Sequence, residues 1–320
     1  MDGILNINKP VGLTSHDVVA RVRRLLQQKR VGHAGTLDPL ASGVLPVCLG
    51  LATRVADYLS ESGKAYQAEV MLGVETDTYD REGHIVSTQP VPDLSREQIE
   101  SVLRSFIGPQ LQVPPAYSAV KLQGEPAYRR ARAGESLKLE ARPVVIERLA
   151  LLDWQKPRLR LEIECSKGTY IRSLAHDLGQ RLGCGAHLSA LLRTRSGPLK
   201  LQESVTLEEL AEALARGDLE RYLWPLDIAL QHYPALVLDR QTLQRVLHGN
   251  SFRAPEPGPR SASPALASGA GEAGPQRGER EGAPLARVCD EQGRTWALAI
   301  WVPEKRLWQP TRVFRPEGSS

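Results

Sequence analysis

The chain has 320 residues, 41% of them hydrophobic, and a formal net charge of +4 at pH 7. This length leaves room for one main domain with a sizeable core and a second, smaller domain. The cysteines, at positions 48, 165, 184 and 289, have no Cys-x-x-Cys spacing, which argues against a disulfide framework or a zinc site. The N-terminus lacks the features of a signal peptide and no stretch is apolar enough to span a membrane, so we expect a cytoplasmic protein without membrane association.

Hydrophobic periodicity predicts strands and helices in mixed order. Capping signals at Ser15, Ser95 and Thr206, the last with Glu209 in capping-box spacing, mark three helix starts. Because strands and helices do not alternate regularly, we expect an α+β fold built on a mixed, largely antiparallel sheet. In chain order the expected elements are strand 4–7, helix 15–28, strands 44–49 and 66–72, helix 95–106, strand 158–164, helix 169–182 and helix 204–214.

Positive charge is concentrated in the middle of the chain. Residues 121–200 carry 16 basic and 8 acidic side chains. Each basic side chain taken alone is best explained as a solvated residue of a helix or strand, but the block as a whole is typical of a surface that follows a phosphate backbone. The clusters are Arg129, Arg130 and Arg132; Lys156, Arg158 and Arg160; and Arg193 with Arg195.

One glycine-rich loop, residues 32–43, holds a single acid and a single imidazole. Pro39 restricts Asp38 to an extended conformation, while the glycines allow sharp turns and close approach of a ligand. Asp38 therefore lies on a stiff platform. An ordinary surface turn would have the same composition, so the loop alone leaves a catalytic role open.

The loop resembles the catalytic loop of the TruB-type tRNA pseudouridine synthases, whose pattern is Gly-His-x-Gly-x-Leu-Asp-Pro-x-Ala-x-Gly. The resemblance covers residues 1 to about 230 in order and spacing. Several ordered motifs are far more specific than any one of them. The other motifs are Asn8-Lys9-Pro10-x-Gly12, Lys64-x-Tyr66, Thr76-Asp77-Thr78, Pro114-Pro115-x-Tyr117-Ser118-Ala119-x-Lys121 and Lys167-Gly168-Thr169-Tyr170-Ile171-Arg172-Ser173-Leu174.

The resemblance implies three catalytic residues. Asp38 matches the family's nucleophilic carboxylate, a role that Asp and Glu also take in glycoside chemistry. Arg172 matches the arginine that pairs with it, and we expect this charge to keep the carboxylate ionised and to lower its pKa. Tyr66 matches the tyrosine that stacks on the target base and is proposed to take part in proton transfer. Without the motifs, Tyr66 would be a core aromatic residue and Arg172 a surface helix residue.

The resemblance also implies substrate-binding residues. Extruding a stacked base costs a few kcal/mol, and His33 matches the residue whose ring fills the space left behind. Tyr170 and Leu191 match pocket walls, Asp77 matches an acidic residue that helps to hold the pocket, and Arg54 stands where many members have Lys. Asp77 could equally be a turn residue. Lys9 and Pro10 belong to the first motif, which supports the loop more than the chemistry.

The C-terminal part, residues 231–320, contains a biased segment. Between Arg253 and Pro284, 22 of 32 residues are Pro, Gly, Ala or Ser, so we predict a disordered insertion at about 253–285. The segments 286–289 and 295–302 then predict a hairpin. With residues 243–252 and 312–314 this part resembles a PUA domain, a small β-barrel that binds RNA. A linker followed by an unrelated hairpin is the alternative.

The resemblance implies a pseudouridine synthase fold over residues 1–230 and an isomerase that acts on the T-loop uridine at position 55 of tRNA. Because uridine and pseudouridine are isomers, we expect no cofactor and no metal. The family implies a monomer without an obligate protein partner. Two alternatives remain open: an RNA-guided synthase that needs accessory proteins, and an RNA-binding protein that refolds tRNA without chemistry.

Overall fold

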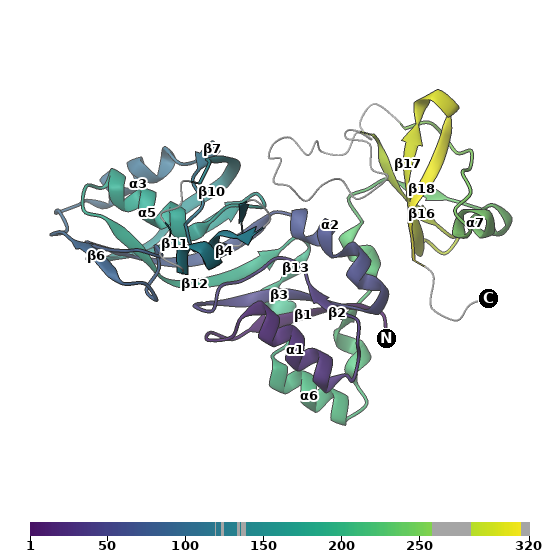
Figure 1. Ribbon diagram of the computed structural model, residues 1–320, viewed down its shortest axis with the longest axis horizontal. Coiled ribbons are helices and arrows are strands. Elements are labelled where there is room, and N and C mark those ends of the chain that lie inside the picture. The colour runs from purple at the N-terminus through teal and green to yellow at the C-terminus, as the bar shows by residue number, and fades with distance from the viewer. Residues whose placement is uncertain (119, 123–124, 133–134, 136–138, 258–282, 315–320) are drawn as a thin grey trace.

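The computed structural model describes residues 1–118, 120–122, 125–132, 135, 139–257 and 283–314. A large unit with a long twisted sheet is followed by a small unit at the C-terminal end (Figure 1). The strands of the large unit are β1 (Gly3–Lys9), β2 (Val31–His33), β3 (Ala41–Leu49), β4 (Lys64–Leu72), β5 (Val74–Thr76), β6 (Ile85–Thr88), β7 (Gly108–Gln112), β8 (Lys121–Leu122), β9 (Glu125–Pro126), β10 (Arg142–Gln155), β11 (Arg158–Cys165), β12 (Ala186–Ser196), β13 (Leu199–Lys200) and β14 (Leu223–Trp224).

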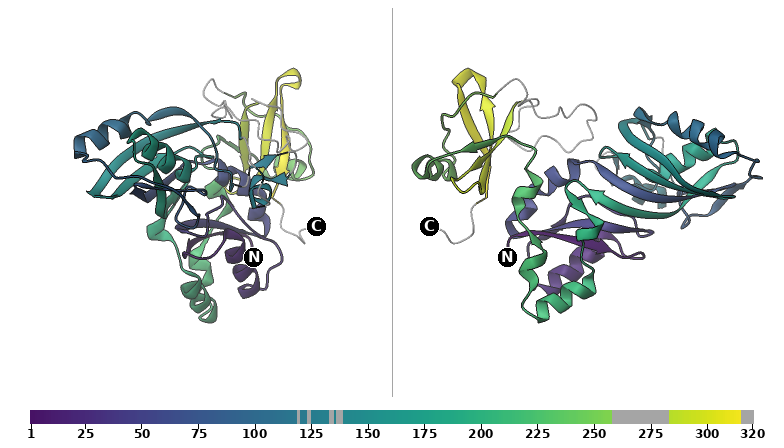
Figure 2. Two further views of the ribbon diagram at one scale, coloured as in Figure 1. Left: turned by 60° about the vertical axis from the view of Figure 1, so that its left-hand side comes forward. Right: turned by 180° about the vertical axis from the view of Figure 1, so that it is seen from behind.

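The helices of the large unit lie mainly beside its central sheet (Figure 2). They are α1 (Ser15–Leu25), α2 (Ala56–Glu61), α3 (Arg96–Arg104), α4 (Ala127–Arg132), α5 (Ile171–Arg181) and α6 (Leu207–Ala215), with short 3-10 helices at Gly50–Val55, Leu201–Glu203, Leu219–Tyr222 and Leu226–Ala229. The elements expected from periodicity are all present. Their bounds differ by a few residues, and the 14-residue strand β10 was not expected.

The central sheet runs in the order β14-β1-β3-β12-β4-β11-β10-β7. Along this path only β3 and β12 are parallel, so the sheet is mixed and largely antiparallel, as expected. Alternation gives β4 two faces: Tyr66, Ala68 and Val70 are buried in the main core, whereas Gln67 is exposed. Helices α3 and α5 cover the buried face of this half, and α1 and α6 lie near β1 and β2 (Figure 1).

Capping fixes where the helices begin. Ser95 and Thr206 each form a full capping box, with Gln98 and Glu209 respectively. For α1, however, the cap is Thr14 and not the expected Ser15. Ser15 is buried inside the first turn, where its hydroxyl bonds the backbone of Leu37 instead of capping the helix.

The small unit contains β15 (Ala235–Val237), α7 (Arg240–Leu247), β16 (Leu285–Cys289), β17 (Thr295–Val302), a 3-10 turn (Pro303–Lys305) and β18 (Leu307–Val313). Its sheet has the order β15-β16-β17-β18, and β16 and β17 form the expected hairpin. Leu298 and Phe314 share a buried cluster with Ile4 and Val44 of the large unit, so the two units pack against each other. Most of the predicted insertion, residues 258–282, lies outside the described residues.

Within the described ranges, none of the helices combines the length and the apolar character needed to cross a membrane.

Candidate active site

The loop between β2 and β3 carries Asp38 and is fastened from two sides. The Ser15 hydroxyl on α1 accepts a hydrogen bond from the Leu37 amide at 2.8 Å and donates one to the Leu37 carbonyl at 3.1 Å. The Gly12 amide donates to the Pro39 carbonyl at 2.8 Å. These bonds fix the backbone on both sides of Asp38, so its carboxylate is held by a rigid support.

Asp38 forms an ion pair with Arg172, as expected from the resemblance. The Arg172 Nε atom lies 3.0 Å from Asp38 Oδ2. Arg172 stands in the first turn of α5, and its side chain is 7% exposed, whereas that of Asp38 is 39% exposed. The arginine is therefore a buried support, and the carboxylate keeps one open side.

The other two guanidinium nitrogens of Arg172 also donate hydrogen bonds. Its Nη1 lies 3.3 Å from Asp80 Oδ2 and donates to the Thr78 carbonyl, and its Nη2 donates to the Tyr117 carbonyl at 2.9 Å. Asp80 is buried, and its other carboxylate oxygen accepts from the Thr78 hydroxyl at 2.7 Å. Each of the three guanidinium nitrogens therefore has at least one acceptor, which fixes the orientation of the group.

Asp80 was missed by the sequence analysis, which selected Asp77 from the same segment. The Asp77 carboxylate instead accepts a hydrogen bond from the His84 amide at 2.9 Å and stabilises the turn, the alternative left open for it. The two acids lie three positions apart in one segment, and the tertiary contact with Arg172 distinguishes them. The residue placed against the arginine is thus Asp80.

The expected direction of the Asp38 pKa was wrong. Arg172 and Lys9 do lower it, as expected of nearby cations. Desolvation is the larger effect, and together with the negative charge of Asp80 it raises the pKa of Asp38 above its ordinary value. The ionised carboxylate is therefore a stronger base and nucleophile than an exposed aspartate.

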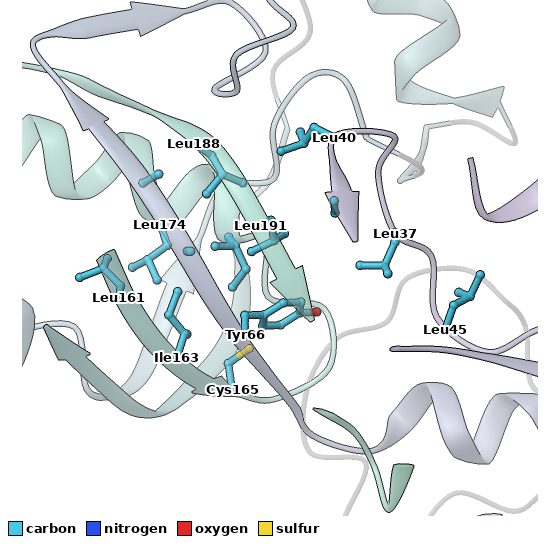
Figure 3. Close-up of a cluster of buried hydrophobic side chains, with 14 of the residues drawn as sticks. Leu37, Leu40, Leu45, Tyr66, Leu161, Ile163, Cys165, Leu174, Leu188 and Leu191 are labelled. Carbon is cyan, nitrogen blue, oxygen red and sulfur yellow. The ribbon is translucent and has the colours of Figure 1, made fainter. Parts of the chain in front are cut away.

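Tyr66 lies on β4, and only 7% of it is exposed. In Figure 3 its ring lies beside Leu191, and its hydroxyl is directed toward the loop segment that carries Leu37. The phenol hydrogen-bonds the guanidinium of Arg193, which favours ionisation, but burial is the larger effect and raises the pKa of Tyr66. Tyr66 and Leu191 thus form one wall of the region beside the loop.

Arg193 was expected to belong to the RNA-facing basic surface, but it is 1% exposed. It lies on β12, directly opposite Tyr66 in the strand register. Its neighbour Arg195 pairs with Glu164 at 2.6 Å at a partly exposed position. Residues two apart on a strand normally share a face. Arg193 and Arg195 differ in burial because a bulge between them shifts the strand register.

His33 and Lys9 lie on either side of the loop. His33 ends β2 and is half-buried, and its Nδ1 atom is buried without a hydrogen-bond partner among the described residues. Burial and the charge of Arg193 lower its pKa, which favours the neutral ring. Lys9 is fully buried and donates to the carbonyls of Pro10 and Leu13 at 2.9 and 2.6 Å. Burial lowers the pKa of Lys9 to about 8.

Tyr170 is the N-cap residue of α5 and sets the entry into the turn that carries Arg172. Its amide donates to the Gln112 side chain at 2.8 Å, and its carbonyl accepts from the same side chain at 3.1 Å. Burial raises the pKa of Tyr170, against a smaller lowering by Ser118. Tyr170 is therefore fixed near the arginine.

Pro10 and Arg54 also belong to the expected binding set. The ring of Pro10 is exposed in the turn after β1. Arg54 reaches the small unit, where its Nη1 donates to the Val313 carbonyl at 2.6 Å, and Arg312 donates back to the Arg54 carbonyl. Arg54 thus connects the two units and does not line the Asp38 site.

Among the described residues, no group of three or more His, Cys, Asp or Glu side chains could hold a metal ion. All four cysteines are buried and unpaired. Burial raises the pKa of Cys165, which lies opposite Lys64 in the strand register, to about 11. The ionised and polar groups beside the loop, namely Asp38, Asp80, Arg172, Tyr66 and Arg193, are suited to nucleophilic attack and proton transfer.

Comparisons with known proteins give the family of the chain. The N-terminal domain model of the TruB family pseudouridylate synthases matches residues 23–171, and the tRNA pseudouridylate synthase B C-terminal domain matches residues 172–231. A tRNA pseudouridine synthase B of Stutzerimonas stutzeri is 48% identical, covering 99% of this chain and 97% of the relative. One of Dehalococcoides mccartyi is 49% identical, covering 78% of this chain and 83% of the relative.

Solved structures share the fold over nearly the whole chain. A Cbf5-Nop10-Gar1 complex contains a chain that matches with a TM-score of 0.73 and 27% identity, covering 98% of this chain and 85% of that one. An archaeal box H/ACA Nop10-Cbf5 complex matches with a TM-score of 0.70 and 26% identity, covering 99% and 87%. On the evidence of its relatives, its fold and its Asp38 loop, the chain belongs to the TruB family of pseudouridine synthases.

Proposed function

We propose that the protein converts the uridine at position 55, in the T-loop of tRNA, to pseudouridine. Membership of the TruB family gives the reaction class, isomerisation of uridine to pseudouridine in tRNA. The observation that carries the assignment to a site is the ion pair between the partly exposed Asp38 and the buried Arg172. Position 55 is taken from the family resemblance.

The reaction breaks the bond between N1 of uracil and C1′ of ribose, turns the base, and joins C5 to C1′. The proton on C5 is lost and one is gained at N1, so no atom is added and no electron is transferred. Asp38 acts as the nucleophile, at C6 of the base or at C1′ of the sugar, and its raised pKa makes its ionised form reactive. Arg172 holds it in the orientation for attack.

The base pocket is formed by Tyr66, Leu191 and Tyr170. Tyr66 stacks on the uracil, and its phenol takes part in moving the C5 proton. Leu191, which is 9% exposed, provides an apolar wall that retains the detached base. A dry pocket of this kind prevents loss of the free base to solvent.

The target uridine must leave the T-loop stack before it reaches Asp38. His33 lies on the same loop, and the lowered pKa of its half-buried ring favours an uncharged surface that can stack on bases. We therefore assign to His33 the space vacated by the flipped nucleotide. The cost of extrusion, a few kcal/mol, is offset by stacking and by phosphate contacts.

The domain division follows the two units. Residues 1–230 form the catalytic domain, and residues 231–320 form a PUA-like RNA-binding domain whose described elements are the four-stranded sheet β15-β16-β17-β18, helix α7 and a 3-10 turn. We propose that the protein acts as a monomer without an obligate partner. The guided alternative has support from the fold shared with the Cbf5 complexes, whereas the higher identity to tRNA pseudouridine synthase B favours the stand-alone enzyme.

Tritium release tests this function. The purified chain alone is incubated with a tRNA transcript labelled at C5 of uridine, and with a second transcript in which the T-loop uridine is replaced. We expect release from the first transcript and none above background from the second. Release from both would overturn the assignment to position 55. Binding without release would favour the guided or the tRNA-refolding alternative.

A further inference from the structure

Arg193 is a buried cation whose guanidinium has no carboxylate within ion-pair distance among the described residues. It is 1% exposed and lies in the middle of the central sheet. A charge in this position is unfavourable unless every donor has an acceptor. Burying this charge costs desolvation free energy that an apolar side chain such as leucine at the same position would not cost.

The contacts of this guanidinium join three segments. Its Nε donates to the Val44 carbonyl on β3 at 2.7 Å, and its terminal nitrogens donate to the carbonyls of Gly35 and Thr36 at 3.0 and 3.3 Å. It also hydrogen-bonds the phenol of Tyr66 on β4. One side chain thus connects the start of the Asp38 loop to the tyrosine.

The backbone of Arg193 packs directly against the glycine at the end of the Asp38 loop, Gly43. A Cβ atom on Gly43 would lie 2.2 Å from the Arg193 carbonyl oxygen, and Gly43 has a φ of +100°. One on Gly35 would lie 3.7 Å from the guanidinium. The contact at Gly35 is an ordinary one, so only Gly43 must be a glycine for the Arg193 backbone to lie where it does.

We infer that Arg193 is a positioning residue for the reaction: its guanidinium bridges the start of the Asp38 loop and the phenol of Tyr66, and so holds that phenol against the loop. The inference rests on the proposed role of Tyr66 in proton transfer. When the ionised phenol accepts the C5 proton, its negative charge is lost and the neutral phenol remains; the electron pair of the C–H bond stays on the base. Arg193 keeps its proton throughout.

The electrostatics agree with this arrangement. Arg193 is among the groups that lower the pKa of Tyr66, against the larger effect of burial. Other groups that act on Tyr66 are Cys165 and Asp38, and both raise its pKa. Removing the guanidinium charge should therefore leave only influences that disfavour the phenolate.

The experiment uses the full chain with 3-fluorotyrosine at its tyrosines, and the signal of Tyr66 is identified by its absence in Tyr66→Phe. We titrate Tyr66 by fluorine NMR in the parent, Arg193→Lys and Arg193→Gln, and measure single-turnover rates and tRNA affinity on the unlabelled proteins. Arg195→Gln is the matched control, because Arg195 lies two residues along the same strand and pairs with Glu164.

We expect Arg193→Gln to raise the pKa of Tyr66 and to slow the single-turnover rate by a factor of roughly 100, the usual range for general acid–base groups. Arg193→Lys should lie between it and the parent. Affinity for tRNA should change less than about threefold in either Arg193 variant, and Arg195→Gln should leave the pKa of Tyr66 as it is in the parent.

Three results would overturn the inference. An unchanged pKa of Tyr66 in Arg193→Gln would remove the electrostatic coupling. A raised pKa with an unchanged rate would instead show that the coupling exists but that Tyr66 is not the proton acceptor, which is the failure of the proposed function. If both Arg193 variants lost cooperative unfolding in chemical denaturation, the role of Arg193 would be to stabilise the fold and not to position Tyr66.

Discussion

Replacing Arg172 by Met should move the acid limb of the pH–rate profile upward. Asp38 must be ionised to act as a nucleophile, so the rate rises as the pH passes its pKa. Arg172 is the largest influence that lowers this pKa, through contact at 3.0 Å. Without it, desolvation and Asp80 act unopposed by the arginine, and a higher pH is needed to ionise Asp38.

The size of the shift follows from the geometry. A carboxylate beside an arginine commonly has its pKa lowered by about 1–3 units. The Asp38 side chain is 39% exposed, and solvent screening reduces the effect, so we expect the limb to move by about one to two pH units. Asp80→Asn should move it in the opposite direction, by less than about one unit, because Asp80 is among the groups that raise the pKa of Asp38.

Single-turnover tritium release between pH 4.5 and 9 measures the limb for each variant. Arg181→Met, at the other end of α5, is the control for loss of an arginine from this helix. A limb that stays in place in Arg172→Met, or that moves in the same direction in both site variants, would refute the electrostatic account of Asp38.

Three further outcomes follow from the packing. Gly43→Ala should lower the free energy of unfolding by more than about 2 kcal/mol in chemical denaturation, because its Cβ meets the Arg193 carbonyl at 2.2 Å; a loss below about 0.5 kcal/mol would contradict this contact. Burial lowers the pKa of Lys64 from 10.5 to about 8, so the unfolded state binds more protons between these values. The stability of the parent relative to Lys64→Met should therefore rise between pH 8 and 10, by at most about 1.4 kcal/mol per pH unit, and a flat difference would refute it. Arg54→Ala should speed amide exchange in β18, because Arg54 hydrogen-bonds the Val313 carbonyl, and should change tRNA affinity less than about threefold. A larger loss of affinity would show that Arg54 binds tRNA.

Local features of the fold were predictable from the sequence, because their signals lie within a few residues. Alternation located β4 and β11, and the capping boxes at Ser95 and Thr206 located two helix starts. The cap of α1 was misplaced by one residue, because Thr14 and Ser15 are both good caps. Asp17, three residues after Thr14, completes a capping box with it, whereas the residue three positions after Ser15 is Val18.

The part of the site that lies within the family motifs was predictable from the sequence. The pairing of Asp38 with Arg172 was expected from the resemblance and is present. The roles of Asp80 and Arg193 were not, because both depend on contacts between distant segments: Arg172 meets Thr78 across 94 positions, and Arg193 meets Gly35 across 158. Such separations leave no periodic signal in the chain.

The direction of the Asp38 pKa also required the fold. The sequence names the cation that lowers it, but burial is a property of the whole surrounding structure and outweighs that cation. The same reasoning applies to Arg54: the resemblance placed it among the substrate-binding residues, and only the fold shows its hydrogen bond to the Val313 carbonyl.

The most direct test of the central claim compares the parent with Asp38→Asn on the same labelled tRNA. Asparagine keeps the shape of the side chain and removes its charge, so the variant should retain tRNA affinity within about threefold while tritium release falls to background. Release at a rate near that of the parent would contradict Asp38 as the nucleophile. Loss of affinity together with release would mean that Asp38 holds the structure of the loop.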